Sequence, residues 1–243
     1  DHNIIVLSAS SAQETYEQTI RAFNLAETYM TPVILLLDEI VGHSTEKVVL
    51  PDPDTIETVD RRRPDVPPEK YLPYKVTKDC RPVLAPFGTG YRYHVTGLCH
   101  NETGFPTNDP KEIDRLIRRL YDKIENRRDE IIDCREHHLE DAEIVLFAYG
   151  SVARAARSAV ATCRADGIRA GLLEPRVLWP FPDEKVLEIA GRAKAFLVPE
   201  MNLGQMSREV ERASRGAVVH RLNRVDGNPI PPTDIVEKIK EVV

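Results

Sequence analysis

Cysteine is scarce in this 243-residue sequence, and its spacing excludes several kinds of site. The cysteines lie far apart and form no C-x-x-C pair, which argues against a disulfide framework and against a complete zinc or iron–sulfur motif. The pattern predicts a reduced, cytoplasmic setting and no metal bound by this chain. The four cysteines are Cys80, Cys99, Cys134 and Cys163.

Long apolar runs and an excess of positive charge are lacking as well. No apolar run approaches the roughly 20 residues that cross a bilayer, so we expect no membrane partner. The net charge is -6, and the one basic run, Arg61–Arg63, is short. Nucleic-acid binding normally needs a clustered basic face, so we expect no nucleic acid either. The composition, 42% hydrophobic and 30% charged, is typical of one large or two modest globular domains.

What is present is a stretch patterned like a parallel α/β domain. Apolar runs followed by turns alternate with segments of helical spacing, which predicts right-handed crossovers and a mostly parallel sheet. We expect Ser151 to cap the first of these helices and Thr233 or Asp234 to cap the last one in the chain. The runs are 144–149, 168–174 and 195–199, and the helical segments are 151–166 and 183–190.

The segments before this stretch are less regular. Residues 4–37 read as a single β-α-β unit, whose helix starts at a capping box made by Ser11 and Glu14. One such unit is too small for a domain, so we expect it to be the tail of a larger α/β domain. Prolines and tyrosines interleave over 39–110, which favours an extended arm packed on another surface. A long linking helix is predicted from Asp109 to about His138, with His137 and His138 structural at its end.

The most unusual loop is FGTGYRYHVTGLCHNETG, residues 87–104. It gathers hydrogen-bond donors and titratable groups between glycines, and Arg92 or His94 could face an anionic substrate. The alternative is an ordered loop held against a neighbouring subunit. Cys99 beside His100 lacks a second ligand pair, so a zinc site is disfavoured. The candidate residues, facing a substrate or a partner, are Tyr91, Arg92, His94, Thr96 and His100.

A second candidate group follows the last apolar run of the α/β stretch. Glu200 at a strand's carboxyl end could act as a general acid or base, and Asn202 and Gln205 lie beside it. The alternative is capping of the next helix by Asn202 or its neighbours, or a subunit contact. Gly150-Ser151 lacks the glycines of a dinucleotide fingerprint and the lysine of a P-loop, so a plain strand-to-helix turn is favoured. No constellation amounts to a self-sufficient active site.

Several longer segments carry a family resemblance. They are VLSASSAQETYEQTIRAFNLAETYMTPVILLLDEIVGH, GYRYHVTGLCHNETG, LLEPRVLWPFP, VPEMNLGQMSREV and HRLNRVDGNPIPP. On these segments the sequence resembles the α subunit of 2-oxoacid:ferredoxin oxidoreductases, most closely the 2-oxoglutarate type, over nearly the whole chain.

The resemblance implies an α/β fold with mostly parallel sheets, in three parts. Residues 1–43 would be the terminal β-α-β of a pyrimidine-binding thiamine-enzyme domain, 44–140 an arm and linking helix, and 141–243 a transketolase C-terminal-like domain. The implied enzyme oxidises 2-oxoglutarate on thiamine diphosphate, with coenzyme A and ferredoxin, to succinyl-CoA and CO2. A partner β subunit would hold the diphosphate, Mg and a [4Fe–4S] cluster, and this chain alone would bind none of them. A γ subunit or domain, fused or separate, is a further implied partner.

The sequence also departs from the family pattern. The Tyr-Pro-x-Thr-Pro-type motif, the glutamate that engages the thiamine pyrimidine and the substrate-facing arginine have no counterpart here. We therefore expect a truncated or split α subunit and assign no catalytic residue. A non-catalytic α/β interaction module and a 2-oxoacid dehydrogenase-type thiamine enzyme subunit stay as alternatives. The sequence leaves open the 2-oxoacid used, the direction of flux and the stoichiometry.

Overall fold

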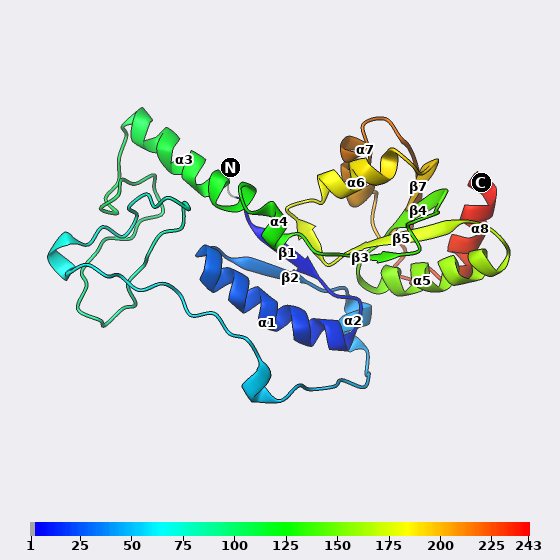
Figure 1. Ribbon diagram of the computed structural model, residues 1–243, viewed down its shortest axis with the longest axis horizontal. Helices are drawn as coiled ribbons and strands as arrows, with labels where there is room; N and C mark the ends of the chain where they lie inside the picture. Colours follow the sequence, from blue (N-terminus) through cyan, green and yellow to red (C-terminus); the bar gives the residue numbers. More distant parts are fainter. Residues whose placement is uncertain (1–2) are drawn as a thin grey trace. The chain divides into compact units, whose positions relative to one another are not determined.

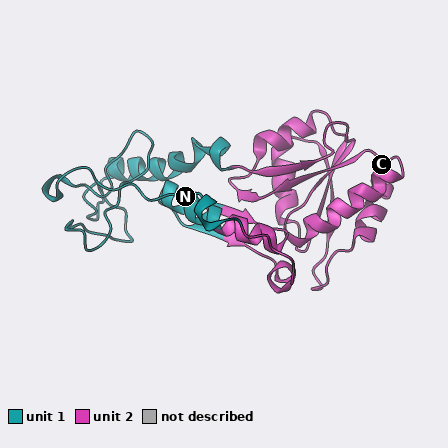
Figure 2. Cartoon of the chain, turned by 60° about the horizontal axis from the view of Figure 1, so that its bottom comes forward, with its two compact units in different colours: residues 1–5, 20–34, 51–131 teal, residues 6–19, 35–50, 132–243 magenta. Residues whose placement is uncertain are grey.

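The structure, a computed structural model, describes residues 3–243, so Asp1 and His2 of the expected first domain lie outside it (Figure 1). The chain divides into two compact units (Figure 2). Unit 1 contains residues up to 5, 20–34 and 51–131, and unit 2 contains 6–19, 35–50 and 132–243. The expected domain boundaries at 43 and 140 stay a prediction. Within residues 3–243, no helix combines the length and the apolar character needed to cross a membrane.

Unit 2 is built on a five-stranded sheet with the order β3-β5-β4-β7-β8. The strands β5, β4, β7 and β8 are parallel, and β3 pairs antiparallel with β5. All residues of β4, β5 and β7 are buried, as expected of parallel strands covered on both faces. The mostly parallel sheet expected from the sequence is confirmed. The bounds are Cys134–His137 (β3), Ile144–Phe147 (β4), Ala170–Pro175 (β5), Ala195–Glu200 (β7) and Val218–Asn223 (β8).

Helices cover both faces of this sheet (Figure 1). Side chains along a strand alternate between faces, and the buried residues accordingly form two clusters. Ile144, Leu146 and Leu172 pack with α5 and α8, whereas Val145 and Phe147 pack with α6 and α7. The helix bounds are Gly150–Ala165 (α5), Asp183–Ala190 (α6), Gln205–Ala213 (α7) and Pro232–Val242 (α8).

The expected β-α-β unit is present, and it belongs to a second sheet of order β2-β1-β6. As predicted, the Ser11 hydroxyl accepts from the Glu14 N–H, at 3.2 Å. Trp179 on β6 pairs antiparallel with Val6 on β1, a strand pairing that the sequence reasoning missed. The bounds are Ile5–Ser8 (β1), Ala12–Tyr29 (α1), Val33–Leu36 (β2) and Val177–Trp179 (β6), and a short helix, Glu39–His43 (α2), follows β2.

The prediction of one long helix from 109 to 138 is wrong. The chain forms α3 (Pro110–Glu125) and a short α4 (Arg128–Ile131), and then continues into β3. Ile124 and Ile131 are both fully buried, so the apolar spacing was real although the helix stops between them. The physical reason for β3 is that β5 would otherwise be an edge strand with unpaired backbone groups.

The proline-rich arm is ordered mainly by tyrosines. Within unit 1, the rings of Tyr91 and Tyr93 pack edge-on against Tyr71, with centroids 4.9 and 5.6 Å away. The Tyr71 hydroxyl donates to the Val83 carbonyl at 2.9 Å and accepts from the Ala85 N–H at 2.8 Å. Two single-turn 3-10 helices, Pro53–Thr55 and Pro68–Lys70, and several turns lie within the arm.

Candidate functional site

A cleft in unit 2 lies where β4 and β7 end, the edge at which parallel sheets usually meet their ligands. Its volume is about 220 Å³. Two sequence-predicted residues, Glu200 and Asn202, line it, and Gln205 begins α7 directly after it. The lining residues are Ser8, Leu36, Leu37, Asp38, Tyr149, Gly150, Val152, Pro199, Glu200, Met201 and Asn202.

Glu200 is buried, with only 1% of its surface exposed. Its two carboxylate oxygens accept from the N–H groups of Met206 and Ser207, each at 2.9 Å. These are among the first N–H groups of α7, which have no partner inside the helix. A carboxylate there is favoured by both hydrogen bonding and the helix dipole. The geometry therefore gives Glu200 a capping role.

Asn202 completes this cap. Its side-chain oxygen accepts from the N–H groups of Gly204 and Gln205, at 2.8 and 3.0 Å. Its amide nitrogen donates to the Tyr149 hydroxyl at 3.3 Å. Asn202 thus binds N–H groups at the start of α7, in line with the capping alternative offered from the sequence, although the N-cap position itself is Gly204.

A carboxylate, that of Asp38, also binds the N-terminus of α5, where the sequence predicted a cap by the Ser151 hydroxyl. Asp38 accepts from the Ser151 N–H at 2.6 Å, and its other oxygen accepts from Val41 N–H at 2.9 Å. The predicted cap, the Ser151 hydroxyl, is buried and makes no hydrogen bond to any described residue. Gly150 permits this approach, because a Cβ there would lie 2.6 Å from the Asp38 oxygen, and its φ is +60°. The expected cap of α8 is also wrong, since that helix begins at Pro232 without a side-chain cap.

The cleft is consequently acidic rather than anion-binding. Burial raises the pKa of Tyr149 to about 12, and the charge of Glu200 acts in the same direction. Both helix N-termini that could attract a phosphate already bind carboxylates of this chain. The cleft therefore suits a neutral or cationic group, and it does not fit a diphosphate.

An ion-pair cluster on β3 and β5 is centred on a buried residue, Glu174, that the sequence reasoning missed in this role. Glu174 is 2% exposed, and its carboxylate accepts from Arg157 at 2.6 and 2.8 Å and contacts the His137 Nε2 at 3.1 Å. Burial raises the pKa of Glu174, but Arg157, His137 and Ser10 outweigh it, and the net pKa is lowered. The sequence signal that could have pointed to Glu174 is its position as the one acidic residue at the end of the apolar run 168–174. His137 lies on β3, so its predicted place at a helix end is wrong.

The predicted loop residues lie in unit 1, and most have local partners. The Tyr91 hydroxyl donates to the Val66 carbonyl at 2.8 Å, and the His94 ring stacks on Phe105 with centroids 4.7 Å apart. The Thr96 hydroxyl accepts from the Leu98 N–H at 3.2 Å. Arg92 is exposed, and the ring of His100 packs on Tyr74. A substrate-facing or partner-facing role for these residues stays a prediction.

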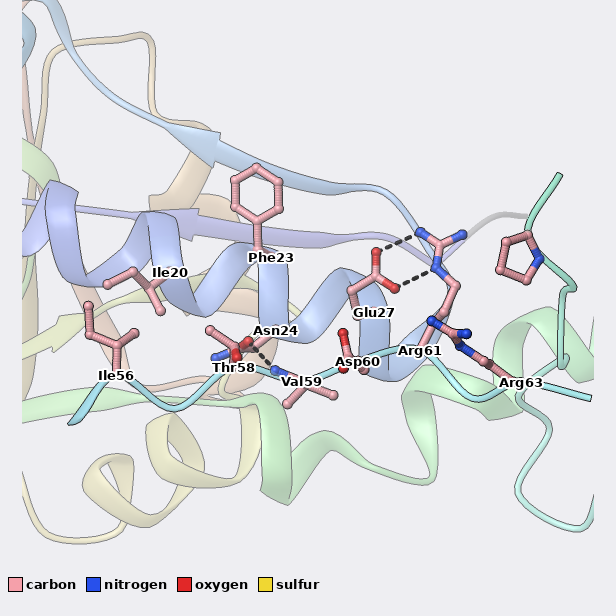
Figure 3. A pocket seen from close by; sticks show the side chains of 11 residues that line it. Ile20, Phe23, Asn24, Glu27, Ile56, Thr58, Val59, Asp60, Arg61 and Arg63 are labelled. Atoms are coloured by element: carbon pink, nitrogen blue, oxygen red, sulfur yellow. Dashed lines mark hydrogen bonds and ion pairs between the residues drawn. The ribbon is translucent and has the colours of Figure 1, made fainter. Parts of the chain in front are cut away.

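A groove of about 500 Å³ in unit 1 is a third candidate, but the arm itself lies along it (Figure 3). Asn24 on α1 accepts from the Val59 N–H at 2.9 Å and donates to the Glu57 carbonyl at 2.8 Å. Figure 3 shows the Arg61 guanidinium bound through two hydrogen bonds, of 2.6 and 2.7 Å, to Glu27. Because its polar groups bind the arm, this groove serves to anchor the arm.

Metal ligands are not grouped in the part of the chain that the structure describes. Among residues 3–243, no three His, Cys, Asp or Glu side chains are arranged to hold a metal ion. Within the described residues, Cys80, Cys99 and Cys163 form no disulfide, and Cys163 is buried. The described residues therefore provide no donor set for magnesium or an iron–sulfur cluster.

Two protein families match the chain. Residues 1–119 match "Pyruvate flavodoxin/ferredoxin oxidoreductase, thiamine diP-bdg", and residues 142–235 match "Pyruvate:ferredoxin oxidoreductase core domain II". A 2-oxoglutarate synthase subunit KorA from Methanothermobacter thermautotrophicus is 46% identical over 98% of this chain. A ketoisovalerate oxidoreductase subunit VorB from Methanothermobacter marburgensis is 34% identical, also over 98%. The chain spans 64% and 60% of the lengths of these two relatives.

A solved structure has the same fold. A 2-oxoglutarate:ferredoxin oxidoreductase from Magnetococcus marinus, with 2-oxoglutarate, coenzyme A and succinyl-CoA bound, superposes with a TM-score of 0.90 at 28% identity. The match covers 98% of this chain and 42% of that chain.

Proposed function

This chain belongs to the 2-oxoacid:ferredoxin oxidoreductase family, and on that premise we propose that it works as part of a 2-oxoglutarate-oxidising enzyme. The proposed reaction converts 2-oxoglutarate, coenzyme A and oxidised ferredoxin to succinyl-CoA, CO2 and reduced ferredoxin. The observation that supports it best is the 46% identity to a 2-oxoglutarate synthase subunit over 98% of the chain. The ketoisovalerate relative, at 34% identity, makes a branched 2-oxoacid the second candidate substrate.

Thiamine diphosphate is the cofactor that the family implies, and the described residues fit it only in part. The first 119 residues match a family named for thiamine diphosphate binding. However, the N-termini of α5 and α7 are occupied by Asp38 and Glu200, so neither can receive a diphosphate. We propose that the diphosphate, its magnesium and the [4Fe–4S] cluster are held by a partner β subunit. We assign no catalytic step to residues of this chain.

Its contribution is then structural and positional. We propose that the unit 2 sheet forms a rigid wall and that the arm contacts a β-type partner. Four large apolar side chains in or beside loop 87–104 support this, because such exposure is favourable when another chain covers it. They are Phe87, Val95, Leu98 and Phe105, with 56% to 87% of their surfaces exposed. A γ subunit and the cytoplasmic location stay predictions.

The test is purification of the tagged chain from its host, with the associated polypeptides identified by mass spectrometry. We expect a β-type subunit to co-purify and the complex to reduce methyl viologen with 2-oxoglutarate and coenzyme A. The isolated chain should be inactive under the same conditions. Activity of the chain without any partner, or a complex inactive with every 2-oxoacid tried, would contradict the proposal. A complex containing a lipoyl carrier instead of ferredoxin would favour a dehydrogenase-type enzyme.

A further inference from the structure

A cavity in unit 1 contains buried positive charge that the proposed function does not use. It measures about 450 Å³, within the usual range for small-molecule sites, and it lies beside α3 and loop 96–100. Most of its lining is apolar, from residues such as Ile4, Leu84, Leu116, Ile117 and Leu120. Three basic side chains interrupt this lining: Arg119, Lys123 and His100.

Arg119 lies on α3 with only 5% of its surface exposed. Its Nη1 is buried, and no residue within 3–243 accepts a hydrogen bond from it. A guanidinium stays charged at any ordinary pH, so it cannot avoid the cost of burial by losing a proton. Leaving a donor of a buried cation without a hydrogen-bond partner is unfavourable. An anion in the cavity would remove that cost.

Lys123 lies one helical turn further along and is 3% exposed. Its ammonium donates to the Met30 carbonyl at 3.0 Å. Burial, and next the charge of Arg119, lower the pKa of Lys123 to about 8. Like charges four residues apart on a helix repel each other, so α3 keeps two unfavourably placed cations on one buried face.

His100 provides a third nitrogen. Its Nδ1 lies 3.1 Å from the Leu98 carbonyl, which can only accept, so Nδ1 carries a hydrogen. Its Nε2 is buried and makes no hydrogen bond to the described chain.

Within residues 3–243, the lining of this cavity contains no aspartate or glutamate. Glu102 and Glu112 line a separate, much smaller cavity, together with Arg119 and His100. The charge of Glu102 acts on Arg119, but burial outweighs it and lowers the pKa of Arg119. The Glu102 carboxylate accepts instead from the Val76 N–H, at 3.0 Å.

We propose that this cavity binds a small organic anion, with its anionic oxygens on Arg119 and Lys123 and its apolar body against the aliphatic lining. Carboxylates and phosphates share this chemistry, since both accept charge-assisted hydrogen bonds from a guanidinium. A small anion fits better than a partner's acidic side chain, because the donors are more than nine-tenths buried within unit 1. Binding at this cavity can be tested on the chain alone.

The experiment measures thermal unfolding and calorimetric binding of the full chain at constant ionic strength. The probes are valerate, inorganic phosphate and, as an uncharged match for valerate, 1-pentanol. A ligand that binds only the folded state raises the unfolding temperature by mass action. We expect valerate or phosphate to raise it and 1-pentanol to leave it unchanged.

The matched variants differ by one position on α3. Arg119→Gln should weaken anion binding at least tenfold, whereas Arg118→Gln should leave it unchanged, because Arg118 is exposed and paired with Asp114. Arg119→Met should also raise the unfolding temperature without ligand, since it removes a buried charge. Should the Arg119 variants fail to fold, Lys123→Met tests the same site and should also weaken binding at least tenfold.

Each outcome of these binding measurements either supports the proposed anion site or overturns it. Binding of valerate, of phosphate or of both, with loss in Arg119→Gln, supports the proposal. No binding of either anion, equal binding by the Arg119→Gln protein, or equal binding of 1-pentanol would overturn it. Protection by a second polypeptide in the absence of any anion response would overturn it too, and would assign the cations to an interface.

Discussion

Two carboxylates of unit 2, Asp38 and Glu200, each bind the first N–H groups of a helix. An aspartate or glutamate at the end of a strand is often interpreted as an acid or base, since polar groups at that edge commonly act on ligands. Here the hydrogen bonds show another use, because each oxygen of Glu200 is already bound to a backbone N–H. For a single residue such as Glu200, the sequence therefore predicted the place in the sheet. It did not predict which groups the carboxylate binds.

Replacing Glu200 with glutamine tests the capping role. Glutamine keeps one acceptor oxygen and turns the second group into a donor, which cannot bind the Ser207 or Met206 N–H. We expect a loss of about 1–2 kcal/mol in unfolding free energy, measured by urea denaturation. Glu237→Gln, an exposed change on α8, should have almost no effect. Equal stability of the two variants would rule out the cap as a stabilising contact.

Lys123 gives a stability change in the alkaline range. Its pKa is lowered to about 8 in the folded chain, against about 10.4 when unfolded. Between these values the unfolded chain binds more protons, so ligand-free stability should rise with pH, by roughly 3 kcal/mol at most. Below about 8 the ammonium is charged in both states and the full penalty is present. Lys123→Met should lack this rise, and an identical pH profile in both proteins would contradict the assignment.

At the scale of elements, the prediction succeeded for the part of the chain in which long apolar runs alternate with helical segments. The strands β4, β5 and β7 and the helices between them follow the sequence closely, because the buried parallel strands are continuous apolar runs. The strands β3 and β6 were missed since neither has such a run. Cys134–His137 is a polar edge strand, and Val177–Trp179 has only three residues. Their pairing depends on distant strands, which no local pattern reveals.

The anchoring of the arm on α1 can be tested with Asn24→Ala. This change removes the acceptor of the Val59 N–H and the donor to the Glu57 carbonyl. We expect faster hydrogen exchange at Val59 and faster proteolysis over 56–63, with an unchanged global unfolding midpoint. Arg61→Ala should have a smaller effect, since exposed ion pairs contribute little. Unaltered exchange at Val59 in the Asn24 variant would show that other contacts hold the arm.

At the scale of the whole molecule, the fold class and family were predictable because several long segments matched together. The candidate site was less predictable. Glu200 and Asn202 were found beside one cleft, but Asp38 and Tyr149 were missed since they come from other strands. The cavity around Arg119 was missed because charged residues of an amphipathic helix are expected on its exposed face, whereas Arg119 and Lys123 lie on the buried face of α3.

Assembly gives a test of the loop at this scale. If a partner covers loop 87–104, Phe105→Ser should lower the fraction of chain in the complex on gel filtration. Phe23→Ser, which changes a still more exposed phenylalanine on α1, should not. Arg92→Ala should leave assembly intact and raise the apparent KM if Arg92 faces the substrate. Full assembly of the Phe105 variant would remove the loop from the interface.

The pairing of β6 with β1 also has a practical consequence. Trp179, the single tryptophan of the chain, lies on β6 opposite Val6 and is 40% exposed. Its indole emission therefore reports on one place in the protein, the contact between the first described strand and a segment about 170 residues later. Fluorescence, without any added label, should distinguish release of β1 from unfolding of the five-stranded sheet.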